Sequence, residues 1–175
     1  MNIVCAFLLF LELYLICFII TLIYASSCDI EEDFNLLDNQ EPKLVTLQNK
    51  LSPLFTEDCS YKGTILEDIM TLQTKRRIQN EISLSKGKKS YTINKEEIFL
   101  CLKDENDQYY NDNMLVYVLL HEISHSVCNE IGHTKKFHKI FQAFIDKAVE
   151  MKIYDDSIPL IRNYCLYNND DDKQQ

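Results

Sequence analysis

The stretch LVYVLLHEISHSVC, residues 115–128, is the most informative part of this sequence. When its residues are placed at about 100° per step, the aliphatic side chains fill one arc of a helical wheel. His121 and His125 fall on the opposite side of that wheel, and Glu122 falls at the edge of the histidine face. The pattern predicts a helix from about residue 114 to 128 that packs its apolar side on the core and presents both imidazoles to another surface.

The letters HEISH match the pattern HExxH, which on a helix is typical of catalytic zinc centres. Two histidines four residues apart stand one above the other, so both imidazoles can reach the same ion. Glu122 can accept a proton from a water molecule on that ion. The competing interpretation is a surface helix with two solvated histidines. A third ligand would decide between the two.

His133 is the best candidate for that third ligand. Residues 129–132 can end the helix, and Gly132 suits the left-handed turn that returns the chain over the histidine face. Three protein ligands and one water form the open site that zinc catalysis requires. The sequence offers four rivals, namely Glu130, His138, Asp146 and Glu150. The first lies within the turn, the second borders the apolar stripe of the next predicted helix, and the other two point away from the core.

The rest of the chain predicts an α+β fold. Pro42 opens a predicted helix that runs to about Phe55, and Pro53 ends or bends it. Residues 81–85 and 90–94 predict two short strands around a turn at Gly87, and residues 97–102 predict a third, well-buried strand. A last helix with an apolar stripe is expected from about residue 135 to 152. Residues 65–78 fit either a helix or a partly extended segment.

These elements predict one domain, residues 42–166. We expect a small, mainly antiparallel sheet that packs on the HExxH helix and on the C-terminal helix. The polar loop before the HExxH helix contains Asp112 and Asn113, and either side chain can cap that helix.

The N-terminal residues 1–27 are predicted to be a transmembrane anchor. Residues 3–25 are apolar except for Glu12, and about 20 such residues suffice to cross a bilayer. A cleaved secretory signal is the alternative, but it needs a basic start and a shorter apolar core. Residues 28–41 predict an acidic juxtamembrane linker, and residues 167–175 predict a disordered acidic tail.

The formal net charge of -9 argues against nucleic-acid binding by the protein as a whole. The one local exception is a weak basic patch between Lys75 and Lys95. It contains Lys75, Arg76, Arg77, Lys86, Lys88, Lys89 and Lys95. Lysines that protect a sheet edge are the simpler interpretation of this patch, and a surface for an anionic partner is the alternative.

The cysteines and the absence of N-glycosylation sites favour a domain on the cytosolic side of a membrane. Beyond the predicted anchor the cysteines are odd in number and form no CxxC pair, which predicts scattered reduced thiols. The sequence also contains no Asn-x-Ser/Thr acceptor. The amino-acid usage suits an AT-rich genome and is compatible with a viral origin. If the chain is viral, the membrane is that of the host cell or the virion.

The segment LLHEISHSVCNEIGHTKKFHKIFQAFI resembles the WLM and SprT-like zinc metallopeptidases, whose pattern is HExxH, a later histidine, then a phenylalanine and a helix. Residues 90–155 are similar to uncharacterised WLM-like metallopeptidases of large DNA viruses. The resemblance implies a zincin-like fold, with His121, His125 and His133 as zinc ligands and Glu122 as the catalytic acid and base. Cellular members usually have a shorter gap between the second and third histidines.

The sequence therefore predicts a membrane-anchored zinc metallopeptidase that hydrolyses polypeptides with a water molecule activated by Glu122. The substrate is expected to lie extended along the sheet edge. The tyrosines that could stabilise the carbonyl oxygen are Tyr109, Tyr110, Tyr117 and Tyr164. The alternative function is a membrane-tethered zinc-binding interaction module without proteolytic activity. Its mark would be a closed site completed by Cys128 or Glu130.

Overall fold

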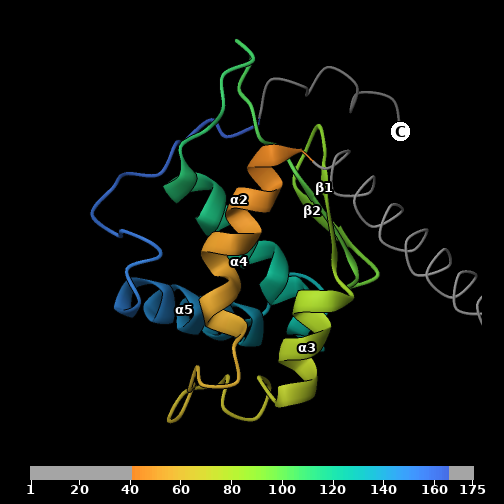
Figure 1. Ribbon diagram of the computed structural model, residues 1–175, viewed down its shortest axis with the longest axis vertical. Helices are drawn as coiled ribbons and strands as arrows, with labels where there is room; N and C mark the ends of the chain where they lie inside the picture. Colours follow the sequence, from red (N-terminus) through yellow and green to blue (C-terminus); the bar gives the residue numbers. More distant parts are fainter. Residues whose placement is uncertain (1–40, 166–175) are drawn as a thin grey trace, which may run out of the picture. The chain divides into compact units, whose positions relative to one another are not determined.

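The computed structural model of the chain describes residues 41–165. These residues form an α+β domain in which helices pack on one side of a three-stranded sheet, and the α+β class agrees with the prediction (Figure 1). The predicted anchor at 1–27, nearly all of the linker at 28–41, and the tail at 167–175 lie outside the described residues. Between residues 41 and 165, no helix is both long enough and apolar enough to cross a bilayer.

The described elements follow the predicted order along the chain. They are the helices α2 (Pro42–Leu51), α3 (Leu72–Asn80), α4 (Asp112–Val127) and α5 (Lys135–Glu150), the 3-10 helix η1 (Ser52–Phe55), and the strands β1 (Ser83–Lys86), β2 (Tyr91–Ile93) and β3 (Glu97–Leu100). Pro53 acts as predicted, because α2 ends just before it and continues as η1. The ambiguous segment 65–78 forms a series of turns followed by most of α3.

The sheet has the order β1–β3–β2, and its strands pair differently from the prediction. β1 pairs with β3 in parallel, whereas β2 pairs with β3 antiparallel, so the sheet is mixed rather than mainly antiparallel. β1 and β2 do not form a hairpin around Gly87, because β3 lies between them. The physical reason is burial: β3 contributes the fully buried Ile98 and Leu100 and therefore takes the central position.

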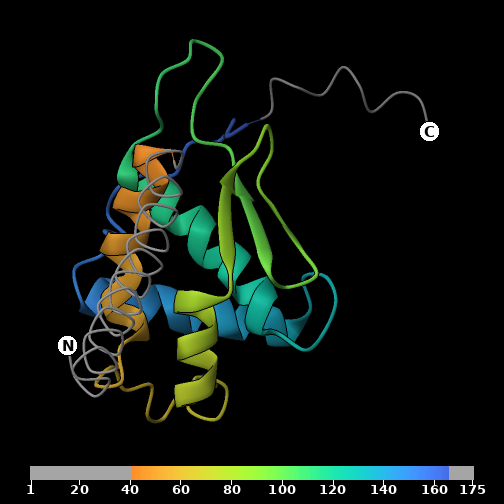
Figure 2. The same cartoon turned by 45° about the vertical axis from the view of Figure 1, so that its right-hand side comes forward.

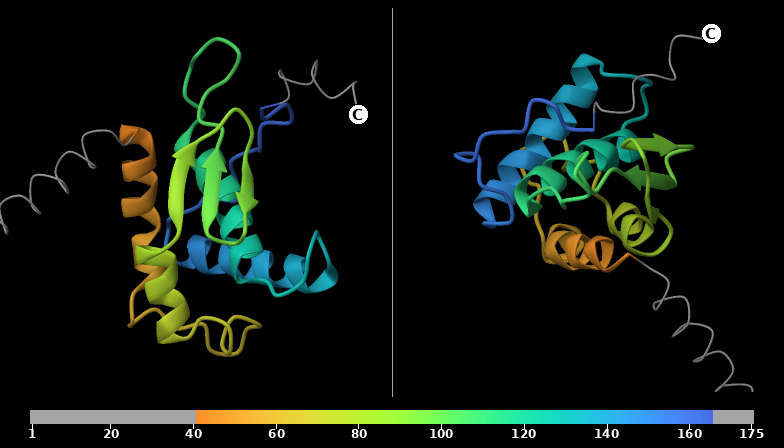
Figure 3. Two further views of the ribbon diagram at one scale, coloured as in Figure 1. Left: turned by 90° about the vertical axis from the view of Figure 1, so that its right-hand side faces the viewer. Right: turned by 90° about the horizontal axis from the view of Figure 1, so that it is seen from above.

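Helix α4 lies across one face of the sheet, and α5 packs against α4 (Figure 3, left). α2 lies along the β1 edge. The apolar stripe predicted on the last helix is confirmed, because Phe137, Ile140 and Phe144 are fully buried. The N-cap of α4 differs from the expectation: the side chain of Asn111, rather than that of Asp112 or Asn113, accepts the Met114 N–H.

A disulfide joins Cys101, just after β3, to Cys165 near the end of the described chain. For this pair the prediction of reduced thiols is wrong, whereas Cys59 and Cys128 are buried free thiols. Sequence spacing could not identify the pair, because the two cysteines are 64 residues apart and meet only when the chain folds back. The disulfide also removes the cysteine argument for a cytosolic domain.

Breaking this disulfide is expected to lower the free energy of unfolding. Closing a loop of this length restricts the unfolded chain by about 4 kcal/mol in the chain-entropy model. Urea unfolding of the wild type with and without a phosphine reductant measures the loss. The variant Cys165→Ser should start from the lower stability, and the reductant should not reduce it further. A wild type that is equally stable in both conditions contradicts the prediction.

Candidate metal centre

Helix α4 holds the two histidines of the HExxH pattern on one face. His121 and His125 are both partly exposed, while the neighbouring Leu120 and Ile123 are buried against the core. The C-terminal end of this helix is held by two cations, because Arg77 donates to the Ser126 carbonyl oxygen and Lys95 donates to that of Cys128. Cations at a helix C-terminus stabilise it by interaction with the helix dipole. The two imidazoles therefore project from a helix whose C-terminal end is fixed by these contacts.

The loop between α4 and α5 returns His133 to the same face. Gly132 has a φ of +78°, the left-handed conformation that the sequence predicted for this glycine. Directly after His133, the side chain of Thr134 accepts the Phe137 N–H and caps α5. The left-handed turn and this cap fix the direction in which His133 enters the site. Figure 2 shows the loop beside the sheet.

The three imidazoles converge through the same nitrogen atom. The Nε2–Nε2 distances are 3.3 Å between His121 and His125, 3.2 Å between His125 and His133, and 3.0 Å between His133 and His121. Zinc–nitrogen bonds of about 2.0–2.1 Å at tetrahedral angles separate ligand nitrogens by about 3.3 Å. The three nitrogens therefore fit three corners of the coordination tetrahedron of one zinc ion, with the fourth corner left for a non-protein ligand.

The side chain of Phe137 forms the floor beneath this triangle. Its ring stacks on His125 at 4.2 Å between centroids, and it meets the rings of His121 and His133 edge-on at 4.9 Å. Phe137 is fully buried and comes from α5, so it joins the second helix to all three imidazoles. The sequence places this residue in the apolar stripe of the last predicted helix, and the family pattern of a histidine followed by a phenylalanine includes it. Neither pattern predicts its ring contacts with the three imidazoles.

Burial and mutual repulsion lower the pKa values of His121 and His125. Burial is the largest cause that lowers the pKa of His121 to about 4, and the neighbouring histidines lower it further. The pKa of His125 is lowered for the same reasons, burial first and then His133. A histidine must be neutral at Nε2 to bind a metal, so these shifts keep metal ligands available at neutral pH.

The metal-free protein is expected to lose stability as the pH falls from about 6.5 to about 4. In this window the unfolded His121 binds a proton while the folded one does not, so acid favours the unfolded state. The loss in the free energy of unfolding should be about 2–3 kcal/mol. Urea unfolding at pH 7 and pH 4.5 measures it. His121→Gln should flatten the dependence, whereas His138→Gln should retain it. An equally steep loss in His121→Gln refutes the assignment.

Glu122 lies beside the histidines and is only 5% exposed. The Thr92 hydroxyl on β2 donates to its Oε2 at 2.7 Å and lies 3.1 Å from its carbonyl oxygen. Burial raises the pKa of Glu122, and the Thr92 hydrogen bond opposes that shift. A carboxylate with a raised pKa is a better proton acceptor in a reaction. Thr92 was missed in the sequence, because only the sheet pairing brings it to α4.

The histidines and Glu122 open into one cavity of about 550 Å³. The cavity lies between β2, the start of its following turn, and the α4–α5 loop. Its lining consists of Ser90, Tyr91, Thr92, Asn94, Lys95, His121, Glu122, His125, Glu130, Ile131, Gly132 and His133. Tyr91 and Ile131 are exposed apolar residues at its mouth, with 43% and 94% of their surfaces accessible. Such a cavity can hold an extended ligand with apolar side chains.

The rival ligands do not join the triangle. Among residues 41–165, only His121, His125 and His133 bring metal-binding atoms within 4.8 Å of one another as a group. His138 is exposed, and its ring centroid is 6.2 Å from that of His133. Glu130 lines the same cavity but does not belong to the close group of three histidines. The other candidates have different partners: Asp146 accepts from Gln142, Glu150 pairs with Lys147, and Cys128 is buried as a free thiol.

None of the four candidate tyrosines lines the cavity. The Tyr109 hydroxyl binds Glu41, and that of Tyr110 accepts the Cys165 N–H. The Tyr117 ring packs against Phe141 and Tyr154. The Tyr164 hydroxyl binds Ser90, which itself lines the cavity.

The predicted basic patch is largely used within the domain. Lys75 is only 6% exposed and donates to the carbonyl oxygens of Thr56 and Cys59. Arg76 pairs with Glu57, while Arg77 and Lys95 bind the end of α4 as described above. These contacts give four of the seven cationic residues structural roles, which the sequence alone could not distinguish from an anion-binding surface.

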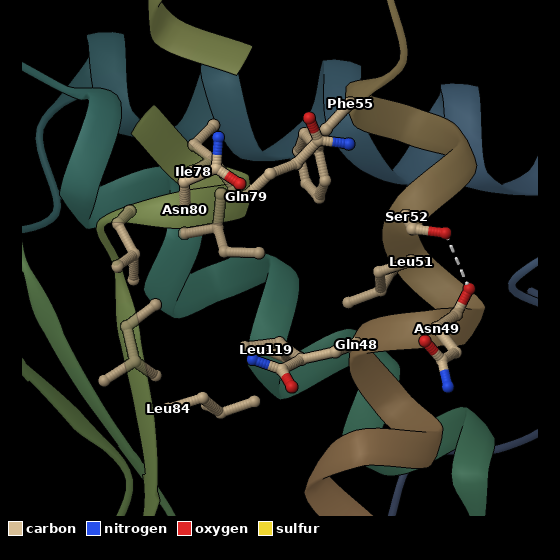
Figure 4. Close-up of a pocket in the computed structure, with 13 residues that line it drawn as sticks. Gln48, Asn49, Leu51, Ser52, Phe55, Ile78, Gln79, Asn80, Leu84 and Leu119 are labelled. Carbon is tan, nitrogen blue, oxygen red and sulfur yellow. Dashed lines mark hydrogen bonds between the residues drawn. The ribbon is translucent and has the colours of Figure 1, made fainter. Parts of the chain in front are cut away.

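A second hollow of about 440 Å³ lies on the opposite edge of the sheet, between α2, α3 and β1 (Figure 4). Its floor is aliphatic, and carboxamides such as Gln48 and Gln79 stand at its rim. No ionisable side chain lines it, so it offers no group for acid–base or metal chemistry. The cavity at the histidines is therefore the better candidate for a functional site.

Comparisons with known proteins find viral relatives. The chain is 46% identical over 100 residues to uncharacterized protein 136R of Invertebrate iridescent virus 6, a match that covers 55% of this chain and 56% of that protein. It is 42% identical over 89 residues to uncharacterized protein 042R of Invertebrate iridescent virus 3, covering 50% and 56%. Uncharacterized protein R325 of Acanthamoeba polyphaga mimivirus is 40% identical over 67 residues, covering 37% and 34%.

The chain thus spans about half the length of the two iridescent-virus proteins and a third of the mimivirus protein. No protein-family model matches the chain, and no solved structure matches it. The similarity to viral proteins agrees with the viral character suggested by the sequence. The zincin-like fold and the WLM or SprT-like resemblance stay predictions.

Proposed function

We propose that the chain is a zinc-dependent metallopeptidase with a zincin-like catalytic domain. The observation that carries this proposal is the triangle of His121, His125 and His133, whose Nε2 atoms lie 3.0–3.3 Å apart beside the buried Glu122. Three imidazoles with an open fourth position and an adjacent carboxylate form the arrangement that hydrolytic zinc enzymes use.

When zinc is bound, it acts as a Lewis acid that lowers the pKa of water and polarises the substrate carbonyl. Glu122 accepts the proton from the attacking water and then returns it to the leaving amine. Thr92 holds one oxygen of Glu122 at 2.7 Å, which leaves the other oxygen for proton transfer. Phe137 keeps the three imidazoles convergent beneath the reacting groups.

The substrate class that fits best is an extended polypeptide. β2 is an edge strand, and its residues Tyr91 and Thr92 line the cavity. An extended peptide can add to such an edge through main-chain hydrogen bonds and present its scissile bond to Glu122. The apolar side chains of Tyr91 and Ile131 at the mouth favour binding of apolar residues next to that bond.

A membrane anchor at residues 1–27 belongs to the proposal on sequence grounds alone. Retention of the full chain in membranes after alkaline extraction tests this part, and release into the supernatant refutes it. The alternative, a non-catalytic zinc-binding module, requires a closed site. Among residues 41–165, neither Cys128 nor Glu130 belongs to the group of three histidines, and this observation favours the enzyme over the closed site.

The experiment that tests the proposal measures zinc and hydrolysis on the same preparation. The full chain should contain about one zinc per molecule by atomic absorption and should cleave an unfolded, fluorescently labelled protein. Removal of zinc with a chelator should abolish cleavage, and stoichiometric zinc should restore it. Zinc-loaded protein that cleaves no polypeptide under any condition refutes the enzyme and leaves the binding module.

A further inference from the structure

We propose that Tyr164 is a positioning residue for Glu122, and that the Cys101–Cys165 disulfide makes this positioning depend on the redox state. The inference rests on the proposed function, because it concerns the alignment of the proposed catalytic carboxylate. It is carried by a closed ring of hydrogen bonds at the start of β2.

The ring links the segments of Ser90 and Cys101 to that of Tyr164, which is distant from both in the sequence. The Cys101 N–H donates to Ser90 Oγ at 3.0 Å, Ser90 Oγ lies 2.7 Å from Tyr164 Oη, and Tyr164 Oη donates to the Cys101 carbonyl at 2.6 Å. Since Tyr164 uses its only proton on Cys101, the Ser90 hydroxyl must donate to Tyr164. Each hydroxyl then donates once and accepts once, an arrangement that strengthens its members.

This ring anchors the strand that holds Glu122. Ser90 directly precedes β2, and both Ser90 and Thr92 line the catalytic cavity. Thr92 in turn donates to the Glu122 carboxylate at 2.7 Å. Tyr164 is also close enough for the Glu122 charge to contribute to its raised pKa, although burial is the larger cause. A displacement of Ser90 therefore shifts the next two residues, Tyr91 and Thr92, and with Thr92 the hydrogen bond to Glu122.

The disulfide keeps Tyr164 in the ring. Residues 155–165 contain no helix or strand, and residues 155–163 are largely exposed, so few regular contacts hold the segment that carries Tyr164. Cys165 is covalently bonded to Cys101, the same residue whose backbone the Tyr164 hydroxyl binds. The Cys165 N–H also donates to Tyr110, whose ring packs on that of Tyr164 at 4.7 Å. The disulfide therefore restrains Cys165, the residue that directly follows Tyr164, and so limits the movement of the Tyr164 hydroxyl.

Reduction breaks the sulfur–sulfur bond and leaves two thiols. With a phosphine as reductant, the phosphine gains the oxygen of one water and becomes a phosphine oxide, while the two sulfurs receive the two protons. The C-terminal segment is then held by non-covalent contacts alone. We expect Tyr164 to leave the ring more often, so that Ser90, Thr92 and Glu122 are less well ordered. The zinc ligands on α4 and on the following loop do not take part in the ring.

The test compares the wild type with Tyr164→Phe, which removes only the hydroxyl and keeps the ring packing on Tyr110. Tyr109→Phe is the matched control, because its hydroxyl binds Glu41 away from the cavity. We expect Tyr164→Phe to lower kcat about 10-fold, less than the roughly 100-fold cost of a 1 Å misplacement, with KM and zinc content nearly unchanged. A phosphine should lower kcat of the wild type similarly but should add little to Tyr164→Phe.

Hydrogen exchange supplies a readout that does not need catalysis. Oxidised wild type should protect the Cys101 amide and the amides of β2, and both the reductant and Tyr164→Phe should make them exchange at least about 10-fold faster. Cys165→Ser should behave like the reduced wild type and provides a second route if Tyr164→Phe folds poorly. Unchanged exchange and unchanged kcat in the reduced protein overturn the inference. Altered exchange in a protein that cleaves no peptide supports the redox-dependent ring of hydrogen bonds and refutes the proposed function instead.

Discussion

Replacing Glu122 by Gln is expected to lower kcat for peptide hydrolysis by about 10²- to 10⁴-fold, the usual contribution of a general acid–base group. Gln has the size of Glu and can still accept the Thr92 hydroxyl, so the variant should fold. It cannot take a proton from water at neutral pH. Zinc content should stay at the wild-type value, because Glu122 is not part of the histidine triangle.

The control for this prediction is Glu150→Gln. Glu150 is an exposed residue at the end of α5 that pairs with Lys147 and lies outside the cavity. Its replacement removes the same charge from the protein and should leave kcat unchanged. If Glu122→Gln and Glu150→Gln hydrolyse the peptide as fast as the wild type, Glu122 is not the proton acceptor and the proposed mechanism is wrong.

The second large effect is expected for His133→Ala, which should weaken zinc binding by at least about 100-fold. Loss of an indirect partner of a metal ligand already costs about 10- to 100-fold in affinity, and removal of a ligand should cost at least as much. Competition with a chromophoric chelator measures the dissociation constant. The remaining pair, His121 and His125, can still bind the ion but supplies only two of the three protein ligands.

His138→Ala is the matched control, because His138 lies five residues further on at the start of α5 and is exposed. Its removal should leave zinc affinity within about twofold of the wild type. A larger loss of zinc affinity in His138→Ala than in His133→Ala would identify His138, rather than His133, as the third ligand. Equal, wild-type affinity in both variants would show that the metal, if bound, does not use this loop.

Local patterns in the sequence were sufficient for α4 and α5 and for the three histidines that meet at the site, but they left the segment of α3 undecided. The period of the aliphatic residues predicted α4 and α5, because a helix that packs on one side must repeat its apolar residues every three to four positions. The four-residue spacing of His121 and His125 follows from the same geometry. Gly132 suggested the turn that brings His133 back, and the structure brings these three imidazoles together.

Long-range pairing was not predictable in the same way. The segments of β1 and β2 are correct to within two residues, but the prediction joined them as a hairpin. Strand order depends on which strand has the most apolar surface to bury, and the buried Ile98 and Leu100 give the central position to β3. A pattern with a period of two identifies a strand but contains no information on its neighbours.

What the sequence determined by itself is the chemistry: three imidazoles and one carboxylate within thirteen positions, on a helix and the turn that follows it. Only the tertiary structure decided what surrounds them. Thr92 reaches Glu122 because β2 pairs with β3 over α4, and Cys165 reaches Cys101 because the chain returns after α5. Contacts within one helical turn follow from the backbone geometry of neighbouring residues. Contacts between distant segments form only when burial of the whole core favours one arrangement.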